Sequence, residues 1–125
     1  MVANVKDKAV IVGIGNTKFS KESGVSELSL AVQAVKAAID DAGLKPSDID
    51  GMATFTMDTN DEIEVARALG VGELTFYGRS HYGGGAATSC LHQATMAAIA
   101  FPAVLLVTSP LPTLSTGVGT CPMDC

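Results

Sequence analysis

Cysteine is scarce in this chain of 125 residues, where thiols occur only at Cys90, Cys121 and Cys125. A sparse and odd number of cysteines argues against a disulfide framework. Cys121 and Cys125 have no second pair of ligand-type residues beside them, which a structural zinc site requires. The sequence therefore predicts neither a disulfide-stapled fold nor a bound metal.

Positive charge is scarce as well, because eight Lys and Arg residues stand against thirteen Asp and Glu residues. The formal net charge of −5 and the lack of a Lys/Arg stripe argue against nucleic acid as a partner. Every Lys, Arg and Glu lies at or before Arg79, so residues 80–123 carry no charge beyond that of two histidines. Such a stretch is expected to be mostly buried.

A long apolar run is also missing. The best candidate, residues 94–107, is broken by Pro102 and is shorter than a membrane helix, which needs about 20 residues. Residues 1–8 are polar and lack the apolar core of a secretory signal. We therefore expect no membrane span and a cytoplasmic location.

The chain does contain alternating strand and helix patterns. Residues 8–15 form a continuous apolar run that ends in glycine, which is typical of a strand buried on both faces. Ser26 has the character of an N-cap, and the helical spacing that follows it ends at Gly43. The same reasoning along the chain predicts strands near 8–13, 52–57, 74–77 and 103–107, and helices near 27–42, 61–69 and 86–100.

This order predicts an α/β fold, βαβαβαβ, with a mostly parallel sheet and helices on its faces. We divide the chain into a domain over residues 1–100 and an atypical tail over residues 101–125. The tail holds four of the five prolines. Apart from the strand near 103–107 it shows no periodic pattern, so residues 109–117 are expected to form a loop.

Several phrases of the sequence resemble one family. They are residues 8–20, 44–51, 57–60 with 66–70, and 82–87 with Gln93-Ala94. In this order and spacing they resemble the thiolase-like lipid-transfer proteins, relatives of the sterol-carrier-protein thiolase. The resemblance covers residues 8–100 and implies the N-terminal half of a five-layered αβαβα sandwich, which duplicates a βαβαβαββ unit.

The same resemblance implies a function. The resemblance implies acyl-CoA acyltransferases with thiolytic or Claisen chemistry, while some members of the steroid side-chain branch are retro-aldolases with an OB-fold partner. The implied substrate is a coenzyme A thioester, acyl or steroid, with no bound cofactor. The implied partners are a second copy in a homodimer, a complementary thiolase half or an OB-fold protein.

Two further readings follow from what the chain lacks. The second-half His and Cys that serve as base and acid in thiolases are missing, so the chain is expected to be inactive alone. The alternative function is a non-catalytic binding or assembly module of a lipid-metabolism complex. In the tail, Phe101-Pro102 replaces a Gly-x-Ala-Asp step of the family. Either a shifted reading frame near residue 100 or natural divergence would explain this difference.

Three residues of the third helix are catalytic candidates. Cys90 lies near the start of that helix, where the helix dipole favours a thiolate. Aligned on the preceding glycines and Gln93, however, the family's nucleophile falls at Thr88, and two residues of helix turn a side chain by about 200°. We therefore favour Cys90 as a buried apolar residue. Thr88 lacks an adjacent base, and His92 is either a proton-transfer group or a packing residue.

The remaining candidates are a tyrosine and the three glycines that follow it. Tyr82, Gly83, Gly84 and Gly85 are candidate substrate-binding residues at a pocket mouth. Three glycines permit close backbone approach, which suits either an anion or acyl oxygen or the tight packing of two helices. Residues 13–15 are not a dinucleotide fingerprint, because the third glycine position is occupied by Lys18.

Overall fold

The computed structural model describes residues 6–18, 24–55, 61–81, 86–101, 105–109 and 114–120. The elements in chain order are β1 (Ala9–Gly15), α1 (Glu27–Ala42), a 3₁₀ turn (Pro46–Asp48), β2 (Gly51–Phe55), α2 (Glu62–Leu69), β3 (Phe76–Ser80), α3 (Ala86–Ala100), β4 (Leu105–Ser109) and β5 (Leu114–Thr120). The α/β class is confirmed, and α1 and α3 begin and end at the predicted residues. No helix in the described ranges is long and apolar enough to cross a membrane.

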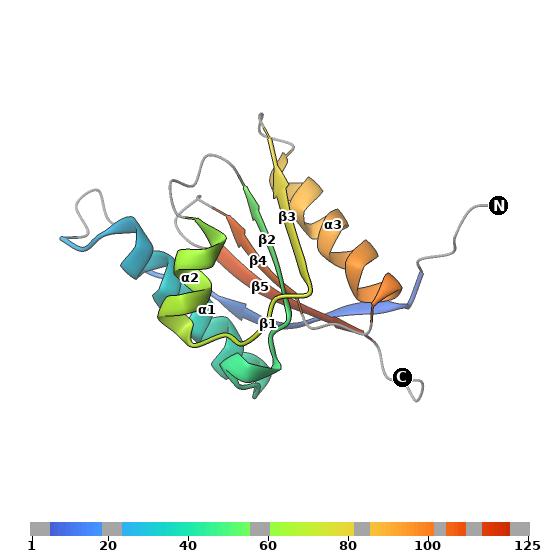
Figure 1. The fold of residues 1–125 in the computed structure, drawn as a ribbon, viewed down its shortest axis with the longest axis horizontal. Helices are drawn as coiled ribbons and strands as arrows, with labels where there is room; N and C mark the ends of the chain where they lie inside the picture. Colours follow the sequence, from blue (N-terminus) through green and yellow to red (C-terminus); the bar gives the residue numbers. More distant parts are fainter. Residues whose placement is uncertain are drawn as a thin grey trace.

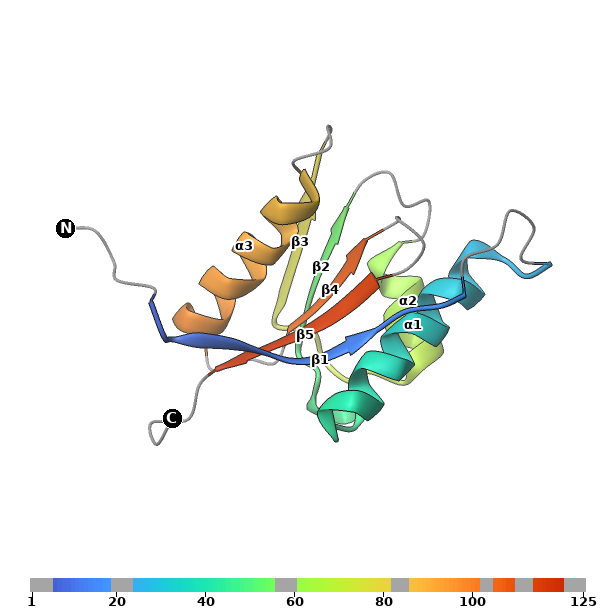
Figure 2. The same cartoon turned by 180° about the vertical axis from the view of Figure 1, so that it is seen from behind.

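The strands form one sheet in the order β1-β5-β4-β2-β3. β2 pairs in parallel with β3 and β4, whereas β5 is antiparallel to both β4 and β1. It follows that β5 alone runs against the other described strands. Figures 1 and 2 show α1 and α2 on one face of the sheet and α3 on the other. The fold is therefore three-layered, with β4 as the middle strand of the sheet.

The expected loop over residues 109–117 is wrong at 109 and 114–117, because β4 ends at Ser109 and β5 begins at Leu114 and lies between β1 and β4, while residues 110–113 lie outside the described residues. Two apolar residues among seven, with glycines at 117 and 119, give this segment little strand propensity. Pairing on both edges compensates for this, since each neighbouring strand supplies backbone hydrogen bonds. Residues beyond 100 thus contribute two strands to the same sheet as the rest of the chain, and the observed order βαβαβαββ matches the unit that the resemblance implies.

The expectation that β1 is buried on both faces is also wrong. β1 is an edge strand, and Val10, Ile11 and Ile14 are 37%, 50% and 54% exposed. An apolar run is buried on both faces only when strands flank it and helices cover both sides. The position of β1 at the edge is set by the topology of the whole sheet, which the run itself does not encode.

Smaller differences affect the other strands. β3 is shifted from 74–77 to Phe76–Ser80, because the parallel register pairs Gly51 with Phe76 and Phe55 with Ser80. Residues 56–57 and 103–104, which were predicted as strand, lie outside the described residues. The shift of β3 carries Arg79 and Ser80 onto the end of a strand next to β2.

Two clusters of buried residues lie on opposite faces of the sheet. The α3 side holds Ala53, Phe55, Cys90, Ala94, Ala97 and Ala98. The side of α1 and α2 holds Ala31, Val35, Ile39, Ile49, Met52, Val65 and Ala66. β2 supplies alternate residues to both clusters, as the period of two of a strand requires.

The first helix is positioned by glycine in β1. A Cβ added at Gly13 would lie 2.3 Å from the Ala38 carbonyl oxygen, and one at Gly15 would lie 2.0 Å from that of Ala34. The two glycines therefore let the backbones of β1 and α1 approach closely. The predicted caps are present, because Ser26 Oγ accepts from the Ser29 N–H at 3.2 Å and Gly43 has φ of 68°.

Candidate functional site

The candidate site lies where β2 and β3 end and α3 begins. In open α/β sheets, ligands bind beyond the carboxyl ends of the strands. Here β2 ends at Phe55, β3 ends at Ser80 and α3 starts at Ala86. Tyr82 and the glycines at 83–85 lie outside the described residues, so their expected binding role stays a prediction.

Cys90 faces the core. Its side chain is 1% exposed, and Sγ donates to the Thr54 carbonyl oxygen at 3.2 Å. Phe55 and Ala94 belong to the same buried cluster. A thiol enclosed in this way, with its proton directed at a carbonyl oxygen, is not presented to a substrate that arrives from solvent.

Thr88 and His92 lie on the other side of α3 from Cys90. Both are exposed, and they are four residues apart, which is about one turn. The structure therefore brings Thr88 and His92 onto one face and separates both from the thiol. The three helix candidates do not form one catalytic group.

Ser80 and Ser89 were not singled out from the sequence. Ser80 is 4% exposed, and its Oγ donates to Ser89 Oγ at 3.1 Å. This hydrogen bond joins the end of β3 to the first turns of α3. The available signal was the place of Ser80 at the carboxyl end of a strand, but the strand was predicted to end earlier.

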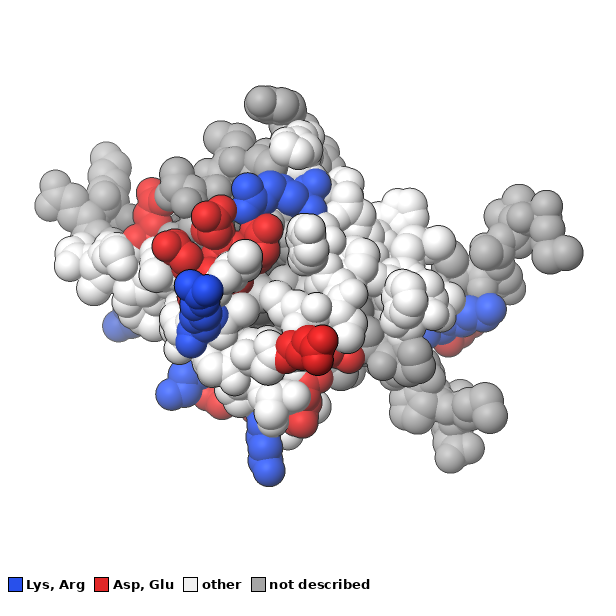
Figure 3. Space-filling view, viewed as in Figure 1, with Lys and Arg blue, Asp and Glu red and all other residues white. Residues whose placement is uncertain are grey.

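Arg79 forms the second polar contact of this edge. Its Nη2 donates to Asp61 Oδ1 at 3.1 Å and also to Glu62 Oε2. The hydrogen bond with Glu62, followed by that with Asp61, raises the pKa of the Arg79 guanidinium above its ordinary value. Figure 3 shows acidic side chains gathered near the start of α2 with basic side chains beside them.

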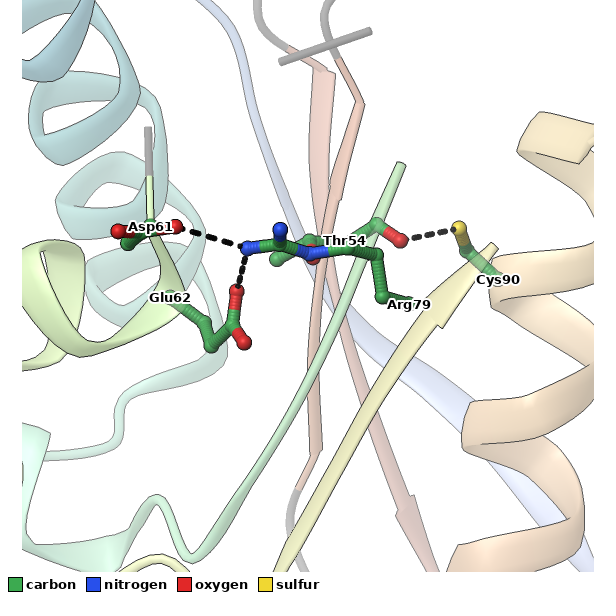
Figure 4. Close-up of polar contacts among 5 residues, drawn as sticks. All are labelled: Thr54, Asp61, Glu62, Arg79 and Cys90. Carbon is green, nitrogen blue, oxygen red and sulfur yellow. Dashed lines mark hydrogen bonds and ion pairs between the residues drawn. The ribbon is translucent and has the colours of Figure 1, made fainter. Parts of the chain in front are cut away.

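The ion pairs of Arg79 and the hydrogen bond of Cys90 to Thr54 lie on opposite sides of β2. In Figure 4, Arg79 extends from β3 towards α2, whereas Cys90 approaches Thr54 from the side of α3. The pairing of Asp61 and Glu62 with Arg79 is not visible in local sequence, because these residues are 18 and 17 positions apart from it. Within the ranges that the structure describes, no group of three or more His, Cys, Asp or Glu residues could hold a metal ion.

Comparison with known proteins identifies a similar lyase and a similar aldolase, while no family model matches the chain. The chain is 63% identical over 90 residues to the 17-hydroxy-3-oxo-4-pregnene-20-carboxyl-CoA lyase of Mycobacterium tuberculosis, covering 72% of this chain and 23% of the lyase. It is 63% identical over 89 residues to the steroid side-chain-cleaving aldolase of Thermomonospora curvata, covering 71% of this chain and 23% of the aldolase. The chain thus spans about a quarter of the length of the curated relatives it matches.

Solved structures agree on the fold. The Ltp2-ChsH2(DUF35) aldolase superimposes with a TM-score of 0.81 and 54% identity, over 85% of this chain and 28% of that one. The monomeric SCP2-thiolase like protein type 1 of Mycobacterium smegmatis has a TM-score of 0.65 and 24% identity, over 82% and 23%. The 3-oxoacyl-[acyl-carrier-protein] synthase III of Aquifex aeolicus reaches 0.72 at 15% identity, over 93% and 55%.

Proposed function

We propose that this chain, which belongs to the thiolase-like superfamily, forms part of an aldolase that cleaves the side chain of a steroid coenzyme A thioester. The proposal is supported by the 63% identity to two proteins, one named as a lyase of a pregnene carboxyl-CoA and the other as a steroid side-chain-cleaving aldolase. The two other solved structures named above share only the fold, at 24% identity or less. The acyltransferase reading is the weaker one, because Cys90 is buried and offers no exposed thiol for an acyl group.

The chemistry of such a reaction defines what a site must supply. In a thioester with a hydroxyl at the β carbon, as the name of the lyase indicates, a base removes the hydroxyl proton and the Cα–Cβ bond breaks. The β carbon becomes a ketone, and the bonding electrons form a thioester enolate that then takes up a proton. Two devices are required, namely a base for the hydroxyl and positive charge for the enolate oxygen.

This chain supplies part of that requirement. The N-terminal turn of α3 carries partial positive charge, which favours an enolate oxygen. The hydrogen bond between Ser80 and Ser89 holds this turn against β3. We assign no base to the described residues, and infer that it lies in the remaining length that the relatives possess or in a partner chain.

The proposal includes a partner protein. The structural relative at 54% identity is named as an aldolase with two components, Ltp2 and ChsH2. In this chain, Met96 and Phe101, on and just after α3, are 41% and 58% exposed, which leaves apolar surface for a second chain to cover. An OB-fold protein, a complementary thiolase half or a second copy would each provide such cover.

The intact mass of the purified chain after incubation with an acyl-CoA separates the two chemistries. We expect no acyl adduct that depends on Cys90, because its Sγ is enclosed and donates to Thr54. The control is the Cys90→Ser variant, which keeps a donor at the same place. A stoichiometric adduct that is present in the wild type and lost in Cys90→Ser would contradict the aldolase proposal and restore the acyltransferase.

A further outcome addresses the assembly alternative. Native mass spectrometry of the same sample with a steroid β-hydroxyacyl-CoA should show non-covalent binding of the thioester. An unmodified oligomer without any bound thioester would instead favour the non-catalytic assembly module.

A further inference from the structure

The N-terminus of α2 has no side-chain cap among the described residues. Of the eight residues of α2, only Val65 and Ala66 are buried. Asp61 occupies the N-cap position, but within the described residues its carboxylate accepts no hydrogen bond from the helix. An aspartate at this position ordinarily accepts from an N–H of the first turn and stabilises the helix. Some other contact must therefore hold the first turn of α2 in place.

Arg79 supplies that contact from β3. One guanidinium nitrogen, Nη2, donates to Asp61 and to Glu62, which are adjacent residues at the beginning of α2 (Figure 4). The Asp61 side chain is 69% exposed, whereas that of Glu62 is only 16% exposed. An ion pair at a partly buried carboxylate is screened less by water than one at the surface. Glu62 is therefore the stronger half of this contact.

The route of the Arg79 side chain crosses the end of β2. Thr54 is its cross-strand neighbour, so both side chains lie on the face of the sheet that carries α1 and α2. Thr54 is 3% exposed, and its Oγ1 has no hydrogen-bond partner among the described residues. Its carbonyl oxygen, in contrast, accepts from Cys90 of α3. The end of β2 is thus tied to α3 by Cys90, while the Arg79 side chain on the neighbouring strand reaches α2.

We propose that Arg79 is a positioning residue for the candidate site at the carboxyl ends of β2 and β3, which we call the ligand edge. By holding Asp61 and Glu62, Arg79 fixes the first turn of α2 at this edge. The edge is then held on its α2 side by Arg79 and on its α3 side by the pair Ser80–Ser89. We call the contact of Arg79 with Asp61 and Glu62 the clamp. The clamp is argued from these contacts alone, whereas its effect on a ligand rests on the proposed function. Arginine suits the task because its planar guanidinium holds its donors in a fixed geometry, whereas the three donors of a lysine ammonium rotate at the end of a flexible stem.

Amide hydrogen exchange of the chain tests the clamp without any need for activity. In Arg79→Met we expect the amides of α2 to exchange about tenfold faster, because local opening becomes easier when the tether is lost. The amides of β2 should keep their protection. The matched control is Arg67→Met, which removes an exposed basic side chain from the last turn of the same helix. Equal exchange of α2 in the two variants would overturn the proposal.

Affinity for a steroid β-hydroxyacyl-CoA tests whether the clamp positions the edge. We expect binding to weaken about fivefold in Arg79→Met and to recover in part in Arg79→Lys, which keeps the charge. Faster exchange with unchanged affinity would overturn the positioning role. A wild-type chain that binds no thioester would overturn the proposed function, while the exchange result would still decide the clamp. Should Arg79→Met fail to fold, Glu62→Gln weakens the same contact and is judged by the same two readouts.

Discussion

The Gly15→Ala variant is expected to lose about 3 kcal/mol or more of its free energy of unfolding, which is a large share of the stability of a small domain. The added Cβ would lie 2.0 Å from the Ala34 carbonyl oxygen and 2.4 Å from the Ala38 nitrogen. Both atoms belong to the backbone of α1, so no side-chain rotation relieves the clash. The helix would have to move away from β1. The hydrogen bond that the Ile14 N–H donates to Asp41 Oδ2, with an N···O distance of 2.9 Å, would then be lost.

Urea unfolding followed by circular dichroism measures this effect. The matched control is Gly72→Ala, because a Cβ at Gly72 meets nothing within 4 Å and the φ angle of Gly72 is not positive. We expect the control to change the free energy of unfolding by no more than about 0.5 kcal/mol. Similar unfolding midpoints for the two variants would show that α1 does not pack closely on β1.

The purified chain is expected to associate at micromolar concentration. α3 has no Asp, Glu, Lys or Arg, and one of its faces is exposed, with Met96 41% accessible. The resemblance to thiolase-like proteins implies that this helix is central and covered on all sides. Covering apolar surface contributes about 25 cal/mol per Å², so a patch of a few hundred Å² drives association before entropy is subtracted.

Sedimentation velocity tests this expectation. Met96→Glu should raise the dissociation constant about tenfold or more, because a charge replaces a side chain whose burial contributes about 2 kcal/mol. Ile63→Glu is the control, since Ile63 is 56% exposed but lies on α2, on the opposite side of the sheet. A monodisperse monomer of 12.8 kDa with a cooperative melt would refute the expectation.

Local sequence predicts the elements whose ends are determined locally. α1 starts after the cap Ser26 and ends at Gly43, and both signals act within a few residues. β5 could not be predicted, because its glycines and few apolar residues become a strand only through pairing with β1 and β4. The edge position of β1 depends in the same way on strand order, which is a property of the whole sheet.

In the candidate site, too, some features can be predicted from local sequence and others depend on the fold. Helical spacing is sufficient to place Cys90 and Thr88 on different sides of one helix, since the rotation per residue is fixed. The contact of Arg79 with Glu62 joins residues 17 positions apart, and it arises because α2 packs against α1 and β2, next to the strand that carries Arg79. Contacts of this kind between separate elements depend on the fold, and they cannot be predicted from the pattern of residues within either segment.

The proposed function requires that these residues can replace the matching segment of a steroid side-chain-cleaving aldolase. A chimera tests it most directly, in which the 89-residue matching segment of the Thermomonospora curvata aldolase is replaced by that of this chain. We predict a rate of steroid thioester cleavage within about tenfold of the parent, or about 1.4 kcal/mol in activation free energy. A control chimera takes the equivalent segment from the SCP2-thiolase like protein type 1, which shares the fold at 24% identity. A folded first chimera that is as inactive as this control would contradict the claim.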